Sequence, residues 1–126
     1  MKIFISAIFK KDGSNKELID RVKNVIIKAG HTPYSFADEG YIPDEKEMMQ
    51  RAIAEMNTSD MVAIDITECA FGVGIEAGYM YAKNIPLIVL KSDKAKDSPT
   101  MKGIATNYIV YNNLDDLEIN LLKVIK

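Results

Sequence analysis

The chain has 126 residues, which suits one domain, and we expect residues 1–126 to fold as a single unit. Hydrophobic residues make up 48% of the sequence, which is enough for a real core and argues against wholesale disorder. The net charge of −2, from 16 Lys and Arg against 18 Asp and Glu, provides no general attraction to nucleic acid or to an anionic membrane.

Single copies of cysteine and histidine exclude several classes of site. Cys69 alone cannot form an internal disulfide, and His31 alone argues against a histidine-rich metal site or a Ser-His-Asp triad. The sequence has neither a signal-peptide pattern nor an apolar stretch long enough to span a membrane. We therefore expect a cytoplasmic protein with no metal site.

The first part of the chain predicts strand, helix and strand in that order. Residues Ile3–Phe9 form a nearly continuous apolar run, which is typical of a strand buried on both faces. Ser14 and Glu17 predict a capping box at the start of an amphipathic helix, and Gly30 predicts the end of that helix. Residues Thr32–Phe36 follow as a second short strand.

The middle of the chain repeats this alternation. Residues Asp44–Asn57 have the apolar spacing of a helix, and Met61–Ile66 predicts the third strand. A loop is expected over Thr67–Gly74 because it contains two glycines, and a helix is expected over Ile75–Lys83. Residues Pro86–Leu90 predict the fourth strand.

The end of the chain predicts a short helix over Met101–Ala105, a fifth strand over Tyr108–Tyr111 and a terminal helix over Leu114–Ile125. Strands that alternate with helices imply right-handed crossovers and a parallel sheet. We therefore predict a flavodoxin-like α/β fold, a three-layer sandwich with a five-stranded parallel sheet of order 2-1-3-4-5. Ligands bind such sheets at the carboxyl ends of the strands, which here are followed by Ala7–Ser14 and Asp65–Glu76.

One acidic residue stands beside the glycines of the second of these loops. Glu76 follows Gly72-Val73-Gly74, and we expect it in the first turn of the next helix. The helix dipole would then keep the carboxylate ionised, which suits a nucleophile but also suits simple complementation of the dipole. The two glycines alone do not make a dinucleotide-binding fingerprint.

The stretch from residue 60 to residue 90 resembles the nucleoside 2-deoxyribosyltransferase family, including its deoxynucleoside 5′-monophosphate N-glycosidase branch. The matching positions are Asp65, Thr67-Glu68, the run GVGIE that ends at Glu76, and Gly78, and the opening KIFISAIF looks like the family's first strand. The resemblance implies that Glu76 attacks the anomeric carbon of a (deoxy)nucleoside or its 5′-monophosphate and forms a glycosyl-enzyme ester. A second base or water then resolves the ester, and no cofactor is implied.

The sequence departs from this family at the residue that protonates the leaving base. The family's usual acid is an Asp eight residues before the Asp that opens the third strand, and Ala52 stands at that position here. Five other carboxylates can be considered as replacements, and the sequence selects none of them: Asp38, Glu39, Asp44, Glu47 and Asp65. We name Asp65 beside Glu76 as the catalytic candidates.

The candidate binding residues follow the first three strands. Ser6 can donate a hydrogen bond, Lys10 and Lys11 can hold a phosphate, and Ile8 and Phe9 can flank a base. The phosphate-binding branch has a serine six residues before its nucleophile, where this chain has Ala70. The full candidate set is Ser6, Ile8, Phe9, Lys10, Asp38, Ala70, Gly72 and Gly74.

The resemblance also implies a homodimer, because Ser98, Thr100 and Met101 stand where the family lends residues to a neighbouring subunit's site. Two other functions stay open. A TIR-like domain that cleaves NAD shares the KIFIS opening strand, although the run GVGIEAG favours the first family. A non-catalytic nucleotide-binding or regulatory domain is credible because of Ala52.

Overall fold

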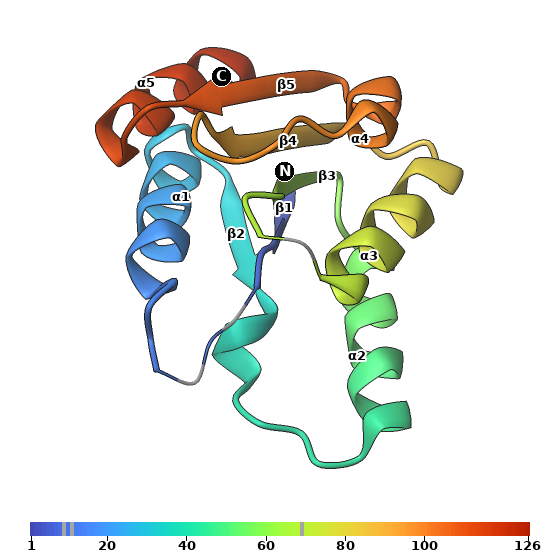
Figure 1. Cartoon of the computed structure of the whole chain (residues 1–126). Helices are drawn as coiled ribbons and strands as arrows, with labels where there is room; N and C mark the ends of the chain where they lie inside the picture. Colours follow the sequence, from blue (N-terminus) through green and yellow to red (C-terminus); the bar gives the residue numbers. More distant parts are fainter. Residues whose placement is uncertain (9, 11, 69) are drawn as a thin grey trace.

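The computed structural model describes residues 1–8, 10, 12–68 and 70–126, and the strands of this part form one parallel sheet (Figure 1). The strands are β1 (Lys2–Ser6), β2 (Thr32–Ser35), β3 (Met61–Asp65), β4 (Leu87–Ser92) and β5 (Asn107–Tyr111). Their order is β2-β1-β3-β4-β5, and every neighbouring pair is parallel. The predicted flavodoxin-like fold and its strand order are confirmed.

Helices cover both faces of the sheet (Figure 1). One face packs against α1 (Lys16–Lys28) and α5 (Leu114–Ile125). The other face packs against α2 (Glu45–Asn57) and α3 (Phe71–Ala82), and α4 (Pro99–Ile104) contributes to the same side. We call these the α1/α5 side and the α2/α3 side.

The alternation of side chains along β1 and β3 divides the core between the two sides. Ile3 and Ile5 pack with the helices of the α1/α5 side, whereas Phe4 between them packs on the α2/α3 side. In β3, Ala63 belongs to the first cluster and Ile64 to the second. Because successive residues of a strand point to opposite faces, a sheet covered on both faces needs the continuous apolar runs seen in the sequence.

Helix α3 begins four residues earlier than the sequence predicts, at Phe71 rather than Ile75. Gly72 and Gly74 lie within its first turns, and neither has a positive φ. The prediction of a loop through these glycines, with Glu76 in the first helical turn, is therefore wrong. Glu76 is the sixth residue of α3, beyond the turn where the backbone N–H groups are unpaired.

The predicted capping box of α1 is also wrong. The N-cap is Asn15, and its side chain makes no capping hydrogen bond. The Asn15 amide instead donates to the carbonyl of Ile8 at 2.5 Å, and the Ser14 N–H donates to the Asp12 carboxylate at 2.8 Å. The bond to Asp12 occupies the Ser14 N–H, which the Glu17 carboxylate would bind in a capping box.

After β2 the chain forms a short 3-10 helix, η1 (Phe36–Glu39), so the second strand ends at Ser35, one residue before the predicted Phe36. The Ser35 hydroxyl accepts a hydrogen bond from the Ala37 N–H at 3.3 Å and so fixes the start of η1. Gly40 ends it with φ of +75°, a conformation that costs glycine little because it has no Cβ.

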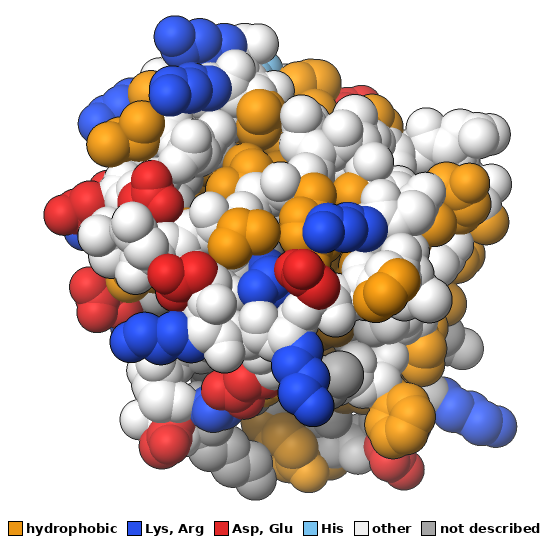
Figure 2. Space-filling model, turned by 45° about the horizontal axis from the view of Figure 1, so that its top comes forward, with side chains coloured by type: hydrophobic (Ala, Val, Ile, Leu, Met, Phe, Trp, Pro, Cys, Tyr) orange, Lys and Arg blue, Asp and Glu red, His pale blue; other side chains and the backbone are white. Residues whose placement is uncertain are grey.

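Charges of both signs are interspersed on the face of the molecule that Figure 2 shows. Charged side chains also form ion pairs: the Asp97 carboxylate lies 3.7 Å from the Lys91 ammonium and 3.5 Å from that of Lys102. In the described part of the chain, no helix is long and apolar enough to cross a bilayer.

Candidate active site

A cavity of about 470 Å³ opens at the carboxyl ends of β1 and β2, between these strands and helices α2 and α3. Its described lining comes from four segments that are far apart in the sequence. The lining residues are Ile5, Ser6, Ala7, Ile8, Ser35, Phe36, Ala37, Gly40, Tyr41, Ile42, Met48, Met49, Ala52, Ala70, Gly72, Val73 and Glu76. The position agrees with the general rule for ligand sites in open parallel sheets.

Glu76 and Ser6 face each other in this cavity. The Ser6 hydroxyl donates a hydrogen bond of 2.6 Å to Oε1 of Glu76. Burial raises the pKa of the Glu76 carboxyl above its usual value, and the hydrogen bond from Ser6 opposes this rise. The helix dipole was expected to keep Glu76 ionised, but Glu76 lies beyond the first turn of α3. The group that favours its ionised form is instead the Ser6 hydroxyl, whose effect is smaller than that of burial.

Ser6 reaches Glu76 because of strand periodicity. Phe4 points to the α2/α3 side, so Ser6, two residues later at the end of β1, points to the same side. Helix α3 follows β3, which pairs directly with β1, and presents Glu76 to that side. The hydrogen bond thus joins the end of one central strand to the helix that follows its neighbour.

The two candidate acids in η1, which follows β2, are engaged elsewhere. The Asp38 carboxylate accepts bonds of 2.6 and 2.7 Å from the Lys23 ammonium of α1. The Glu39 carboxylate accepts a bond of 2.7 Å from the Tyr34 hydroxyl and lies 3.7 Å from the Arg51 guanidinium. Neither carboxylate lines the cavity, although their neighbours Ala37 and Gly40 do.

The two candidate acids at the start of α2 do not line the cavity either. Asp44 is the N-cap and accepts hydrogen bonds from the backbone N–H groups of Lys46 and Glu47. The Glu47 carboxylate pairs with the Arg51 guanidinium at 3.0 Å. Among the described lining residues, Glu76 is therefore the sole carboxylic acid, and none is a histidine, lysine or arginine.

Ala52 itself lies in the cavity wall. It is on α2, with 3% of its surface exposed, and it lines the same cavity as Glu76. Met48 and Met49, one turn earlier on the same helix, line the cavity too. Their spacing from Ala52, of four and three residues on one helix, was the sequence signal that they share its surroundings.

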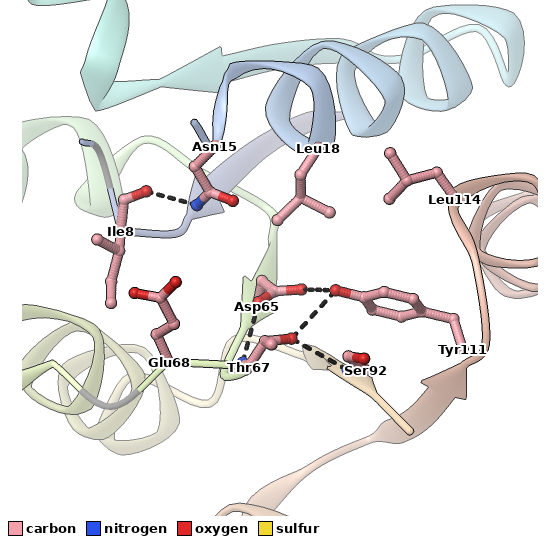
Figure 3. A pocket seen from close by; sticks show the side chains of 9 residues that line it. All are labelled: Ile8, Asn15, Leu18, Asp65, Thr67, Glu68, Ser92, Tyr111 and Leu114. Carbon is pink, nitrogen blue, oxygen red and sulfur yellow. Dashed lines mark hydrogen bonds between the residues drawn. The ribbon is translucent and has the colours of Figure 1, made fainter. Parts of the chain in front are cut away.

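Asp65 lies in a different, smaller pocket of about 240 Å³ (Figure 3). This pocket is on the α1/α5 side and is lined by Ile8, Asn15, Leu18, Asp65, Thr67, Glu68, Ser92, Tyr111 and Leu114. The Tyr111 hydroxyl donates to Oδ2 of Asp65 at 2.6 Å, and the Thr67 N–H donates to Oδ1 at 3.0 Å. The structure therefore does not bring Asp65 into the cavity of Glu76.

Burial raises the pKa of the Asp65 carboxyl above its usual value, although both hydrogen bonds oppose the rise. The ionised form is thus less favourable in the folded protein than in the unfolded chain. The Asp65 carboxyl group therefore stabilises the fold fully below its pKa in the unfolded chain. This stabilisation is lost as the pH rises through its pKa in the folded protein.

We predict that Asp65→Asn melts at the same temperature as the parent protein or higher at pH 7, because it removes a buried charge. The amide can still accept from the Thr67 N–H and donate to the Tyr111 oxygen. Asp65→Ala is the control, and it should melt lower because it leaves both partners without their bond, at a cost of about 1–3 kcal/mol. Thermal melts at pH 3 and pH 7 check this, and a clear loss of stability in Asp65→Asn at pH 7 would contradict it.

The remaining candidate binding residues are distributed over several surfaces. The Lys10 ammonium pairs with the Glu68 carboxylate at 2.6 Å and does not line the cavity. Ala70 and Gly72 line the cavity, whereas Gly74 lines a shallow depression beside it, together with Ala70, Phe71 and Ile75. Phe9, like Lys11 and Cys69, lies outside the described residues.

The segment expected to serve a partner subunit lies at the start of α4. The Ser98 hydroxyl caps this helix by accepting a hydrogen bond from the Met101 N–H at 3.3 Å, and Met101 packs on the α2/α3 side. Ser98, Thr100 and Met101 line none of the pockets described above. Within the described part of the chain, no three His, Cys, Asp or Glu residues are grouped so that they could hold a metal ion.

Comparison with solved structures identifies proteins of the same fold. The CMP N-glycosidase BcmB of Clostridium botulinum is 17% identical with a TM-score of 0.78, over 96% of this chain and 98% of that chain. The 2-deoxyribosyltransferase of Bacillus psychrosaccharolyticus is 15% identical with a TM-score of 0.75, over 94% of this chain and 90% of that chain. The 2-deoxyribosyltransferase of Leishmania mexicana is 17% identical with a TM-score of 0.63, over 81% and 69%.

No protein-family model matches the sequence, and no curated protein matches it either. At 15–17% identity the likeness to the solved structures establishes a shared fold. The same fold can support unrelated functions, so the function is argued from the site.

Proposed function

We propose that this protein cleaves or exchanges the N-glycosidic bond of a (deoxy)nucleoside or its 5′-monophosphate, with Glu76 as the nucleophile. The observation that carries the proposal is the Glu76 carboxylate, held by the Ser6 hydroxyl at 2.6 Å in a largely apolar cavity of about 470 Å³. This volume lies in the usual range for small-molecule sites. The shared fold with two 2-deoxyribosyltransferases and a CMP N-glycosidase supports the same reaction class.

The proposed reaction has two steps. A Glu76 oxygen forms a bond to C1′ of the sugar while the C1′–N bond breaks and its electron pair leaves with the base. A second base, or water, then attacks C1′ and releases the carboxylate, and the proton that it loses to solvent balances the one that the departed base takes up from solvent. Ser6 orients the carboxylate, and neither step calls for a cofactor. Asp65 takes no part in this scheme, because it lines the other pocket.

The described cavity lining favours an uncharged sugar over a phosphorylated one. It contains no lysine or arginine, and the nearby Lys10 is paired with Glu68. A 5′-phosphate would therefore lack the cationic partner that such groups usually have in proteins.

The test is to incubate the pure protein with deoxynucleosides, deoxynucleoside monophosphates and NAD in separate reactions, and to follow base release by chromatography. A second free base, added to a parallel set, distinguishes exchange from hydrolysis. Release from NAD with none from nicotinamide riboside, which has the same charged base on the same sugar, would favour the TIR-like alternative. No release from any nucleoside or nucleotide tested, nicotinamide riboside included, would contradict the proposal.

A second candidate is a non-catalytic nucleotide-binding or regulatory domain. The specific observation in its favour is Ala52, which lines the cavity at the position of the family's usual acid. Under this alternative, calorimetry would detect nucleoside binding while chromatography detected no product.

The first prediction from the proposed function concerns Ser6→Ala. Loss of the hydroxyl removes the hydrogen bond that favours the ionised form of Glu76, so the pKa of the carboxyl should rise further. Hydrogen bonds to charged groups contribute about 1.5–3 kcal/mol, which corresponds to roughly one pH unit or more. The acid limb of the kcat/KM profile should move up by this amount. An unshifted limb would assign Ser6 a packing role only.

The second prediction concerns assembly. Helix α3 exposes an apolar face in which Phe71 (95% exposed) and Ile75 (55% exposed) flank Gly74 and Gly78. Large side chains beside small ones suit close packing of another helix, and an exposed apolar face of this kind is typical of an interface. We propose that this face is buried in a homodimer in which Ser98–Met101 approaches the partner's cavity.

Light scattering should report a dimer for the parent protein and a monomer for Ile75→Lys. Ile119→Lys is the matched control, because Ile119 is 58% exposed on α5, on the opposite side of the sheet. A monomeric parent protein, or equal effects of the two variants, would count against this arrangement.

A further inference from the structure

Among its described lining residues, the cavity of Glu76 offers no second carboxylic acid to protonate the leaving base. Each candidate carboxylic acid that the sequence offered either pairs with a cation, caps a helix or lies in the other pocket. Of the described hydroxyl groups in the lining, that of Ser6 already donates to Glu76, and Ser35 is held at the start of η1. Tyr41 also lines the cavity, and it is 80% exposed, so most of this side chain is in contact with solvent.

The need for a proton donor depends on the charge of the base before the bond breaks. An ordinary purine or pyrimidine is neutral in the nucleoside and leaves as an anion unless it is protonated. A base that carries a positive charge in the nucleoside leaves as a neutral molecule, since the electron pair of the broken bond cancels that charge. Such a substrate needs no acid.

The charge and chemistry of the cavity also suit a cationic ring. Glu76 is the sole ionisable carboxyl group among the described lining residues, so a bound cation would be paired with it. Phe36 and Tyr41 supply aromatic surface, and Met48 and Met49 supply polarisable thioethers. Aromatic faces attract cations, and sulfur contacts with aromatic rings are favourable.

We propose that the substrates are N-glycosides with a positively charged base, such as pyridinium nucleosides or N7-alkylated purine nucleosides. This inference rests on the proposed N-glycosidic activity and names its substrate class. Burial of Glu76 supports it, because a neighbouring cation restores the ionised form that burial disfavours.

The reaction balances without an added acid. The Glu76 carboxylate oxygen bonds to C1′ while the C1′–N bond breaks, and its electron pair neutralises the ring nitrogen. The uncharged base departs and leaves a neutral glycosyl ester on Glu76. Water then adds to C1′, the carboxylate leaves with the electron pair of the ester bond, and the proton of the water passes to solvent.

Two matched pairs of nucleosides test the proposal, each with a charged and a neutral member on the same sugar. They are 7-methylguanosine with guanosine, and nicotinamide riboside with its 1,4-dihydro form. Base release is measured by chromatography for the parent protein and for Glu76→Gln, whose rate serves as the correction for spontaneous cleavage.

The expected kcat/KM is at least about 100-fold higher for the charged member of each pair, which is the lower end of what a general acid contributes. Glu76→Gln should lose this release. Glu76-dependent release with a ratio below about tenfold would overturn the substrate class and leave the N-glycosidic function standing. No Glu76-dependent release from any of the four nucleosides, or from the deoxynucleosides tested above, would overturn both.

Discussion

Glu76→Gln is expected to abolish base release while the protein keeps its fold. The amide has the size of the carboxyl group and can still accept the Ser6 hydrogen bond, but it is a far poorer nucleophile. Loss of a covalent nucleophile should lower the rate by several powers of ten, each of which corresponds to about 1.4 kcal/mol of activation free energy. Chromatography of the released base measures this effect.

The same substitution should leave stability unchanged or raise it at neutral pH. Burial raises the pKa of the Glu76 carboxyl in the folded protein, so its contribution to stability is complete below the unfolded pKa and is lost as the pH rises through the folded pKa. Glutamine removes the buried charge, and its advantage should therefore appear at pH 7 and disappear near pH 3. A substitution that lost activity only through unfolding would lower the melting temperature.

The sequence predicts a different effect, because it places Glu76 in the first turn of α3. Loss of a charge there would cost about 0.3–1 kcal/mol. Because α3 begins at Phe71, this cost does not apply. Thermal melts of both proteins at pH 3 and pH 7 distinguish the two expectations. Equal base release by the two proteins would exclude Glu76 as the nucleophile.

The sheet could be predicted from the sequence because apolar runs of strand length alternate with helical spacing along the whole chain. The start of α3 could not be predicted in the same way. Glycines usually mark loops, yet Gly72 and Gly74 lie in helical backbone at the surface, where the position of an added Cβ has open space around it. The usual association of glycine with turns therefore gave the wrong start for α3, because these two glycines are part of the helix.

Strand periodicity could in principle have predicted that Asp65 and Glu76 lie on opposite sides of the sheet. Ile64 packs on the α2/α3 side, so Asp65 must point to the α1/α5 side with Ala63. What the sequence does not contain is the partner: the Tyr111 hydroxyl comes from the end of β5, 46 residues away, and no local pattern links the two. Long-range polar contacts of this kind depend on strand order and on the exact ends of the strands.

The position of Ala52 suggests a gain of activity. Ala52→Asp introduces a carboxylic acid into the cavity that contains Glu76, at a site with 3% exposure and apolar neighbours. Such surroundings raise the pKa of a carboxyl group, which keeps it protonated near neutral pH and able to donate to a leaving base. We expect base release from ordinary nucleosides to rise about 100- to 10,000-fold.

The gain should depend on the proton and on the charge of the base. Ala52→Asn has nearly the same size as Ala52→Asp but offers no acidic proton, so it reports the effect of shape alone and should not accelerate release from guanosine. Release from 7-methylguanosine should change little in either variant, because its base departs uncharged without an acid. Burial of a polar group at this position will lower the melting temperature of both variants. Because both are destabilised in this way, a difference between their rates cannot be attributed to the loss of stability. Two outcomes would contradict this: equal acceleration by the two variants, or equal acceleration of both nucleosides by Ala52→Asp. Either would show that Ala52 limits the rate through the shape of the cavity and not through the lack of a proton donor.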